Sequence, residues 1–271
     1  MSCIEHFKSY EGITVFPEHQ HTSCEILYLH KGHISIVCGH GEFHMTEGTV
    51  CMIPSCIKHR IVIHDTDRYL RTIIFLNPWT YTRAYYSDAI YNMLMGFIKK
   101  QPIVLKDDFG CLNYFDKIKK EIKANDIVSE DAVVVSVTQM LIQFLRNSGC
   151  LDGAIKKSDK MIFEIQRYIQ ENCGEQILIS DLADRFYISK FYLTHIFKKQ
   201  TGISPRQYLT LTRLTKAYNL LHDSELKVSE ISVRCGFTSP SDMTRKFKEY
   251  YKVSPNEMRK HIFDKSKNNI L

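Results

Sequence analysis

The feature that most constrains the fold is an internal repeat near the C-terminus. When the sequence is shifted by 50 residues, 189–205 lies over 239–255, and six of the seventeen positions are identical. Random pairing would give about one identity at ordinary amino-acid usage. Each copy fits a short helix, a tight turn and a longer helix that begins at a Ser or Thr cap. The repeat therefore predicts two helix-turn-helix units, with one extra residue in the second turn near Gly236.

Helical spacing separates two faces on the longer helix of each copy. Leu193, Ile196 and Phe197 share one face, as do Met243 and Phe247, and these are predicted to pack against the preceding helix. The opposite stripe follows i, i+3, i+4, i+7 spacing and consists of Phe191, Thr194, His195 and Lys198 in the first copy and Ser241, Thr244, Arg245 and Lys248 in the second. A polar stripe is usually only a solvated surface. Its duplication favours a surface that reads a DNA groove, where Arg and Thr contact base edges and Lys neutralises phosphate.

Charge and histidine are distributed unevenly along the chain. Residues 1–150 carry a net charge of −1 and residues 151–271 carry +7, which together give the chain's +6. Nine of the twelve histidines lie between His6 and His64. The basic C-terminal part suits a polyanion such as double-stranded DNA, and the histidine-rich part suits a metal or a small ligand.

An ordered set of residues runs through both units and the helix between them: Leu182-Ala183, Ser189, Leu193, Phe197-Lys198-Lys199, Gly202, Ser204-Pro205, Tyr208-Leu209, Arg213-Leu214-Thr215-Lys216-Ala217, Leu220-Leu221, Val228-Ser229-Glu230-Ile231, Cys235-Gly236-Phe237, Phe247-Lys248, Ser254-Pro255 and Arg259. Over about residues 160–262 the chain resembles the DNA-binding domain of the AraC/XylS family of bacterial transcription regulators. The resemblance implies two recognition helices in successive major-groove segments, about one helical turn apart. It places the base-reading positions on Phe191, Thr194, His195, Ser241, Thr244 and Arg245, with Lys190, Lys198 and Lys248 completing the predicted DNA-binding set.

The second unit departs from the family pattern at two places. Asp242-Met243 stands where the family commonly has Tyr-Phe, and Lys252 stands where a glycine is usual.

The N-terminal part changes its hydrophobic period once. Short apolar runs at 24–30, 33–38, 49–53, 59–63 and 69–76 are separated by turn signals, which predicts antiparallel strands in a sandwich or barrel. Residues 88–100, 109–124 and 129–147 show helical spacing instead. The expected fold class is α+β: a cupin-like β-barrel with a helical segment in a domain 1–147, a linker 148–158, and an all-α double helix-turn-helix domain 159–271.

Histidines and a carboxylate follow a spaced pattern in the first strands. The residues His19, His21 and Glu25, then Gly32, Gly48, Pro54 and His59, resemble the metal motifs of cupins, with Cys56 in place of a usual glycine and Ile63 in place of a usual asparagine. Separations of two and four residues would place the first three on one face if the strand is continuous, and a histidine from a neighbouring strand such as His59 would complete a site for Fe, Mn, Ni or Zn. The alternative is that the four residues line an effector pocket without metal.

The expected function is a cytoplasmic transcription regulator, expected to act as an activator, whose small-molecule effector binds in the cupin-like domain. The expected partners are double-stranded DNA, RNA polymerase and a second copy of the chain, with no membrane contact. The amphipathic helices of 84–147 either support that dimer or only cover the barrel. No catalytic residues are predicted, because no cysteine or serine has the spacing of a nucleophile site. The alternatives are a metal-dependent cupin enzyme and a metal-responsive regulator.

Overall fold

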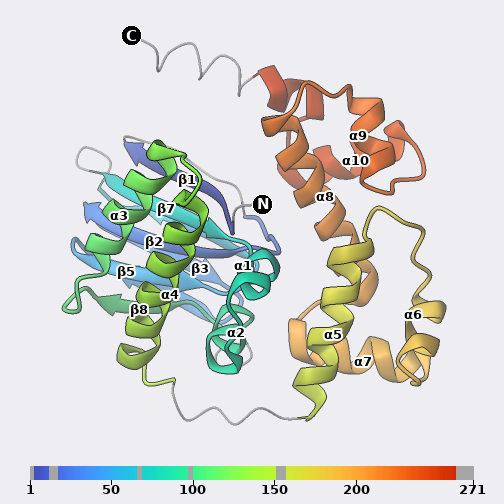
Figure 1. The fold of residues 1–271 in the computed structure, drawn as a ribbon, viewed down its shortest axis with the longest axis horizontal. Helices are drawn as coiled ribbons and strands as arrows, with labels where there is room; N and C mark the ends of the chain where they lie inside the picture. Colours follow the sequence, from blue (N-terminus) through green and yellow to red (C-terminus); the bar gives the residue numbers. More distant parts are fainter. Residues whose placement is uncertain (1–2, 12–17, 66–68, 97–99, 151–156, 261–271) are drawn as a thin grey trace. The chain divides into compact units, whose positions relative to one another are not determined.

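The computed structural model describes residues 3–11, 18–65, 69–96, 100–150 and 157–260 (Figure 1). The chain forms two compact units, Met1–Lys160 and Met161–Leu271. Of the predicted linker 148–158, residues 151–156 lie outside the described residues, and helix α5 already begins at Lys157. Each unit is described separately below.

The described strands of the first unit form two antiparallel sheets. Their bounds are β1 Ile4–Glu11, β2 Cys24–Lys31, β3 Ile34–Cys38, β4 Gly41–Met45, β5 Thr49–Ile53, β6 His59–Ile63, β7 Leu70–Leu76 and β8 Ile103–Lys106. One sheet has the order β1-β7-β2-β5-β8 and the other has the order β4-β3-β6. The predicted runs correspond to β2, β3, β5, β6 and β7, whereas β1, β4 and β8 were not predicted. The two separate sheets make this domain a β-sandwich, so the expected barrel is not closed.

A hydrophobic core lies between the two sheets, because successive strand residues point to opposite faces. Leu27 pairs with Cys51 on one side and Ile73 on the other, and Ile36 pairs with Ile61 in the smaller sheet. The buried residues of this cluster are Leu27, Leu29, Ile34, Ile36, Met45, Cys51, Ile53, Ile61, Tyr69 and Ile73. Apolar side chains from both sheets thus fill the space that a closed barrel would enclose.

Helices cover the other face of the five-stranded sheet (Figure 1). They are α1 Pro78–Ala84, α2 Asp88–Leu94, α3 Cys111–Ala124 and α4 Ser129–Asn147. Phe115 and Ile118 of α3 and Val137 and Phe144 of α4 are fully or almost fully buried in a cluster that includes Ile26 of the sheet. The main apolar stripe of these helices therefore packs on the sheet, as one of the two sequence interpretations proposed.

The second unit is all-helical, as predicted. Its helices are α5 Lys157–Asn172, α6 Ile179–Arg185, α7 Lys190–Thr201, α8 Pro205–Asp223, α9 Val228–Arg234 and α10 Pro240–Tyr251. Helix α8 contacts α7 at one end and α9 and α10 at the other, so it connects two helix-turn-helix units, α6–α7 and α9–α10 (Figure 1). In the part of the chain that the structure describes, no helix has both the length and the apolar character that crossing a bilayer requires.

Candidate DNA-binding surface and ligand-binding site

The two helix-turn-helix units begin their second helices in the same way. The hydroxyl of Ser189 accepts a hydrogen bond from the backbone N–H of Tyr192, and the hydroxyl of Ser239 accepts one from the N–H of Asp242. Such caps satisfy N–H groups that have no partner within the helix. The turn between α6 and α7 has four residues and that between α9 and α10 has five, so the predicted extra residue is confirmed.

The predicted inner face of each recognition helix is buried. Leu193 and Phe197 of α7 and Met243 and Phe247 of α10 are all 0% exposed. Ile196 is only partly buried and contributes less than its spacing indicated. Burying these side chains fixes the rotation of each helix about its axis, because a helix exposes the face opposite its core.

The outer stripe therefore faces solvent in both helices. Exposed members are Lys190, Phe191, His195 and Lys198 in α7 and Ser241, Arg245 and Lys248 in α10, while Thr194 and Thr244 are half-buried. Phe191 is 83% exposed, which is unusual for an aromatic side chain and places an apolar group beside the polar ones. Phe191, Thr194, His195 and Lys198, with Lys199, line a surface hollow of about 400 Å³.

Arg245 is held by two carboxylates of its own helix. One guanidinium nitrogen lies 3.0 Å from Asp242 and another lies 2.9 Å from Glu249. Asp242 also accepts a hydrogen bond from Lys246 at 2.8 Å. Burial raises the pKa of Asp242, but the hydrogen bonds and charge of Lys246, with hydrogen bonds from Arg245 and Thr238, lower that pKa below its ordinary value. Arg245 must leave these partners to fork onto a base, which the sequence alone did not indicate.

Each helix-turn-helix unit has two positions with left-handed backbone, one in its turn and one after its recognition helix. In each unit one of these positions is glycine and the other is not, and the two units differ in which one is glycine. The turn position is Tyr187 (φ 54°) in the first unit and Gly236 (φ 74°) in the second. The position that ends the recognition helix is Gly202 (φ 83°) in the first unit and Lys252 (φ 64°) in the second. The two departures from glycine, Tyr187 and Lys252, are strained because a Cβ is disfavoured in this conformation.

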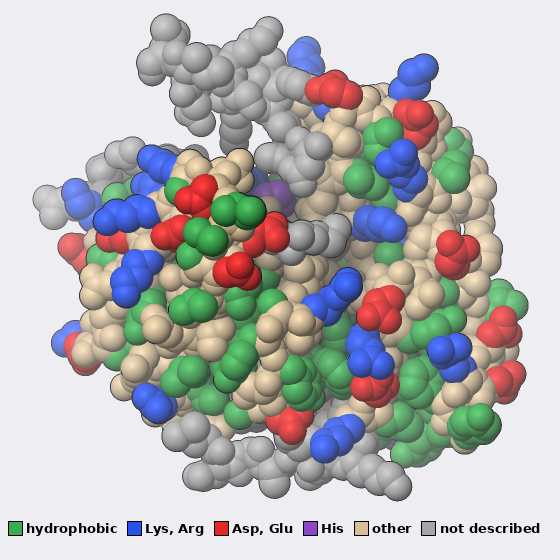
Figure 2. Space-filling view, viewed as in Figure 1, with side chains coloured by type: hydrophobic (Ala, Val, Ile, Leu, Met, Phe, Trp, Pro, Cys, Tyr) green, Lys and Arg blue, Asp and Glu red, His purple; other side chains and the backbone are tan. Residues whose placement is uncertain are grey.

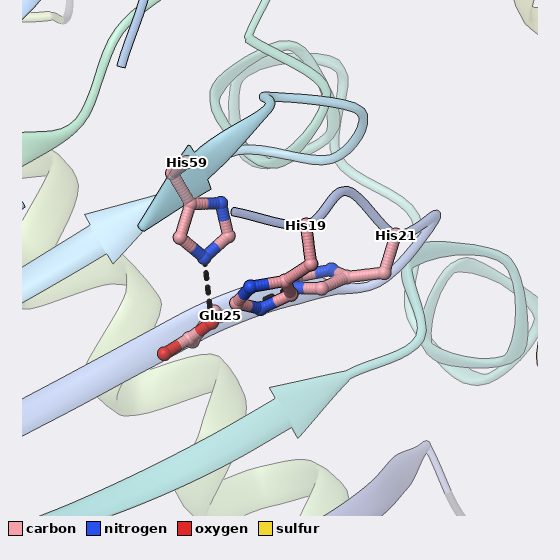
Figure 3. A group of neighbouring side chains, drawn as sticks. All are labelled: His19, His21, Glu25 and His59. Carbon is pink, nitrogen blue, oxygen red and sulfur yellow. Dashed lines mark hydrogen bonds and ion pairs between the residues drawn. The ribbon is translucent and has the colours of Figure 1, made fainter. Parts of the chain in front are cut away.

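In the N-terminal unit, Met1–Lys160, the four predicted ligand residues converge at one end of the sandwich (Figure 3). Glu25 is on β2 and His59 is on β6, and both side chains point between the sheets, where they are 1% and 0% exposed. His19 and His21 come from the segment before β2. One possible ligand atom from each of the four residues lies within 4.8 Å of those of the other three.

Hydrogen bonds orient the two histidines that contact Glu25. Nδ1 of His21 lies 2.8 Å from the carbonyl of Ser23, and Nδ1 of His59 lies 2.9 Å from the carbonyl of Ile57. A carbonyl only accepts, so each Nδ1 carries the proton and donates it. Each Nε2 then faces the Glu25 carboxylate, at 3.3 Å from His21 and 3.2 Å from His59.

A neutral imidazole with its proton on Nδ1 would direct the lone pair of Nε2 at this carboxylate. Either a second proton on the ring or a bound cation removes that repulsion. Burial raises the pKa of Glu25, but hydrogen bonds from His21 and His59 and their charges hold this pKa well below its ordinary value. A low pKa favours the ionised carboxylate, and an ionised carboxylate favours positive charge beside it. Nδ1–H bonded to a carbonyl with Nε2 free is also how protein histidines bind metals.

The reason for this convergence differs from the predicted one. The predicted shared face was conditional on one continuous strand carrying His19, His21 and Glu25, and that condition is not met, because β2 begins at Cys24 and both histidines precede it. Backbone bonds place that segment instead: His19 and His59 exchange N–H to carbonyl bonds of 2.9 Å in each direction, and Cys56 donates its N–H to the carbonyl of His21 at 2.8 Å. Cys56 has φ 64°, which explains why a glycine is usual there.

A buried arginine between the sheets was missed by the sequence analysis. Arg71 of β7 is 1% exposed, and its guanidinium carbon lies 5.0 Å from the ring centre of Tyr10 and 5.5 Å from that of Tyr69. Arg71 shares its face of β7 with Ile73, so strand alternation would have shown that this charge points inward. The hydroxyl of Tyr69 is buried and has no hydrogen-bond partner among the described residues.

The geometry defines a class of protein: a β-sandwich domain with a buried polar cluster, joined to a DNA-binding domain with two helix-turn-helix units. The chain matches an AraC-like ligand binding domain over residues 7–105 and a helix-turn-helix domain over residues 182–261. The HTH-type transcriptional activator RhaS of Citrobacter koseri is 26% identical over 252 residues, covering 91% of this chain and 88% of RhaS. RhaS of Escherichia coli is 24% identical over 249 residues, covering 90% and 87%.

Solved structures of ToxT from Vibrio cholerae share the fold. The unsaturated fatty acid bound form has a TM-score of 0.62 at 16% identity and covers 93% of each chain. The complex with a naphthalenyl butenoic acid has a TM-score of 0.66 at 11% identity. The chain belongs to the AraC family: it is a DNA-binding transcription regulator with an N-terminal ligand-binding domain.

Proposed function

We propose that this protein is a cytoplasmic, dimeric transcription activator that reads an operator with both helix-turn-helix units and responds to a small effector bound in its N-terminal domain. The observation that carries the proposal is the repeated exposure pattern of α7 and α10, in which matched positions are buried against the unit and matched polar positions face outward. RhaS proteins are named as activators, which supports activation through RNA polymerase at a promoter.

The two recognition helices would occupy successive major-groove segments. Thr194, His195, Ser241, Thr244 and Arg245, with Phe191, are the proposed base-reading set. Lys190, Lys198 and Lys248 would contact phosphates, because an ammonium group neutralises backbone charge without reading sequence.

Selection of binding sites from random DNA duplexes, with the full-length chain, tests this mode. Wild type is expected to enrich one bipartite sequence. Lys198→Ala and Lys248→Ala should weaken all sequences alike and reduce the slope of log affinity against log salt by about one each. Lys123→Ala on α3 is the matched control, because that lysine is also exposed but lies in the N-terminal unit, outside the DNA-binding domain. Enrichment of no sequence, or a sequence-selective loss in either lysine variant, contradicts the proposal.

Dimerisation would use apolar side chains that remain exposed on α3, on α4 and in the connection 125–128 between them. Ile122, Ile127, Val128 and Val135 are 43%, 97%, 57% and 55% exposed. Figure 2 shows hydrophobic side chains among charged ones over these helices. Large apolar side chains exposed near one another in the sequence favour an interface. Val135→Asp should shift sedimentation from dimer to monomer, and an unchanged sedimentation coefficient would contradict this interface.

The effector is proposed to act on the buried cluster of His19, His21, Glu25 and His59. Fatty acid bound ToxT supports a small molecule as the class of effector. Binding there would change the balance between conformations with different DNA affinity. His21→Ala should abolish the effector's influence on promoter binding while effector-free binding persists. Loss of effector-free DNA binding would contradict this separation of roles.

A metal-responsive regulator is the second candidate, because the structure fits a cation at the same cluster. Nε2 of His21 and of His59 and the carboxylate of Glu25 would hold the ion, with His19 as the fourth ligand, and a bound divalent ion would supply fixed positive charge there. Metal content of protein purified without a histidine tag, with promoter binding before and after chelation, separates the candidates. Chelation that changes DNA affinity supports metal response, whereas metal-dependent turnover of a small substrate would favour the cupin enzyme.

A further inference from the structure

A second histidine cluster lies on the outer face of the three-stranded sheet, opposite to the core. His44 is on β4 and is paired with Ser35 of β3, while His64 follows β6 and donates its backbone N–H to the carbonyl of His33 at 3.0 Å. Because Ile34 and Ile36 point into the core, the alternating residue Ser35 and its neighbour across the pair, His44, point outward. Three adjacent chain segments thus each contribute one histidine to the same face.

The possible ligand nitrogens of His33, His44 and His64 lie within 4.8 Å of one another. The ring centres of His33 and His64 are 4.7 Å apart, and that of His44 lies 5.9 Å from His33. In a tetrahedral zinc site with Zn–N bonds of about 2.0–2.1 Å, nitrogens lie roughly 3.3 Å apart. The side chains of His44 and His64 are 63% and 37% exposed, so they have room to rotate by this small amount.

Two oxygen-bearing side chains face the same nitrogens. The hydroxyl of Ser35, which is 0% exposed, lies 2.9 Å from Nδ1 of His44 and 2.6 Å from Nε2 of His64. The carboxylate of Glu42 lies 3.9 Å from both of these nitrogens. A buried hydroxyl therefore holds two imidazoles convergent, and a carboxylate stands at the distance of a fourth ligand that a small movement would bring in.

We propose that His33, His44 and His64, with Glu42, form a surface site for Zn²⁺ that is separate from the buried cluster. Three imidazoles and one carboxylate are a donor set that zinc accepts in tetrahedral geometry. The ion cross-links β3 and β4 with the chain that leaves β6. This site does not depend on the proposed effector role, because His59 of β6 points between the sheets whereas His64 points away from them.

Titration of the tag-free, chelator-treated full-length chain with Zn²⁺ alone tests the site. The double variant His44→Ala/His64→Ala should bind one equivalent of Zn²⁺ less than wild type. The same two substitutions made in the His21→Ala variant should also remove one equivalent of Zn²⁺, compared with His21→Ala alone. Glu42→Gln keeps all three imidazoles and should weaken zinc binding at this site by about tenfold or more. His40→Ala, an exposed histidine in the β3–β4 turn, is the matched control and should lose nothing.

Circular dichroism and the fluorescence of Trp79 verify that each variant is folded. Unchanged zinc stoichiometry in the folded double variant would overturn the proposal. An equal loss in His40→Ala would also overturn it, since binding would then be unspecific surface binding. DNA binding of the double variant is measured separately. Retained DNA binding together with the loss of one zinc equivalent supports an independent zinc site. Failure of the zinc proposal is therefore distinguishable from failure of the DNA-binding proposal.

Discussion

The two helix-turn-helix units share one burial pattern and differ in how they achieve it. In unit α6–α7 the left-handed position in the turn is an exposed tyrosine, and the one after the recognition helix is a glycine. In unit α9–α10 the glycine, Gly236, is in the turn, and the residue after the helix is Lys252. Only the second unit places a carboxylate, Asp242, in the first turn of its recognition helix. The repeated core therefore fixes the orientation of both recognition helices, whereas the backbone strain and the charge around each helix are set independently.

Gly236→Ala is the largest expected effect. A Cβ at this position would lie 2.6 Å from the carbonyl oxygen of Cys173 and 2.7 Å from that of Gly174. Overlap with backbone and the left-handed conformation together should lower the free energy of unfolding by about 3 kcal/mol. At Gly202 a Cβ meets nothing within 4 Å, so Gly202→Ala should cost only about 1 kcal/mol.

Urea unfolding of the full-length chain, followed by far-ultraviolet circular dichroism, measures this difference. Trp79, the single tryptophan of the chain, lies in α1 of the N-terminal unit. Its fluorescence transition is therefore the control and should not move. Equal losses for the two glycine variants would show that the turn of the second unit is not tightly packed.

Arg245→Ala should relax base preference at one position and weaken operator binding by about 1–3 kcal/mol. The matched position of the first unit is His195, and His195→Ala should cost about 1 kcal/mol, the scale of a single hydrogen bond. Binding-site selection with each variant measures both effects. If Arg245→Ala leaves specificity unchanged, the ion pairs with Asp242 and Glu249 persist in the complex and the residue is structural.

Lys252→Gly should stabilise the second unit by about 0.5–1 kcal/mol, since a glycine adopts the left-handed conformation without a Cβ penalty. The lost hydrogen bond from Nζ of Lys252 to the carbonyl of Glu249, at 2.9 Å, is exposed and offsets little. Thermal unfolding measures the gain. A lower melting temperature would show that this hydrogen bond outweighs the strain.

The smallest expected effect is the pH dependence of the second unit through Asp242. Its pKa is lowered in the folded protein from the ordinary value of 3.8, so its contribution to stability is present above that pH and is lost as the pH falls below it. Asp242→Asn should therefore flatten the loss of stability on acidification below about pH 3.8. Tyr192 occupies the matched position of α7 and carries no carboxylate, so Tyr192→Phe is the control. Identical acid profiles for wild type and Asp242→Asn would contradict the ion-pair network.

The helical unit was predictable from its sequence to a large extent. Leu193, Phe197, Met243 and Phe247 repeat at helical spacing, and the caps at Ser189 and Ser239 are local signals. The apolar runs of β2, β3, β5, β6 and β7 were found, but the short apolar run of β8, Ile103–Lys106, was missed. Strand β4 was also missed, because its sequence from Gly41 to Met45 is mostly polar. Strands at a sheet edge with a solvated face carry a weaker pattern than buried ones.

The candidate sites were predictable only in part. The set of His19, His21, Glu25 and His59 was identified by spacing, but the continuous strand on which the shared face was conditional does not form, because β2 begins at Cys24. The convergence of His33, His44 and His64 was not predicted, because it depends on the register that pairs β3 with both β4 and β6. The inward position of Arg71 was readable from alternation and was overlooked.

By itself the sequence determined the duplication, the basic C-terminal half and the buried and exposed faces of the recognition helices, since these depend on residue type and on a period of a few residues. The tertiary structure decided which distant residues meet: the two histidine clusters on opposite faces of one small sheet, the carbonyls that require Gly236, and the burial of Arg71. Contacts between segments far apart in the chain follow from strand register and loop closure, which no local periodicity encodes.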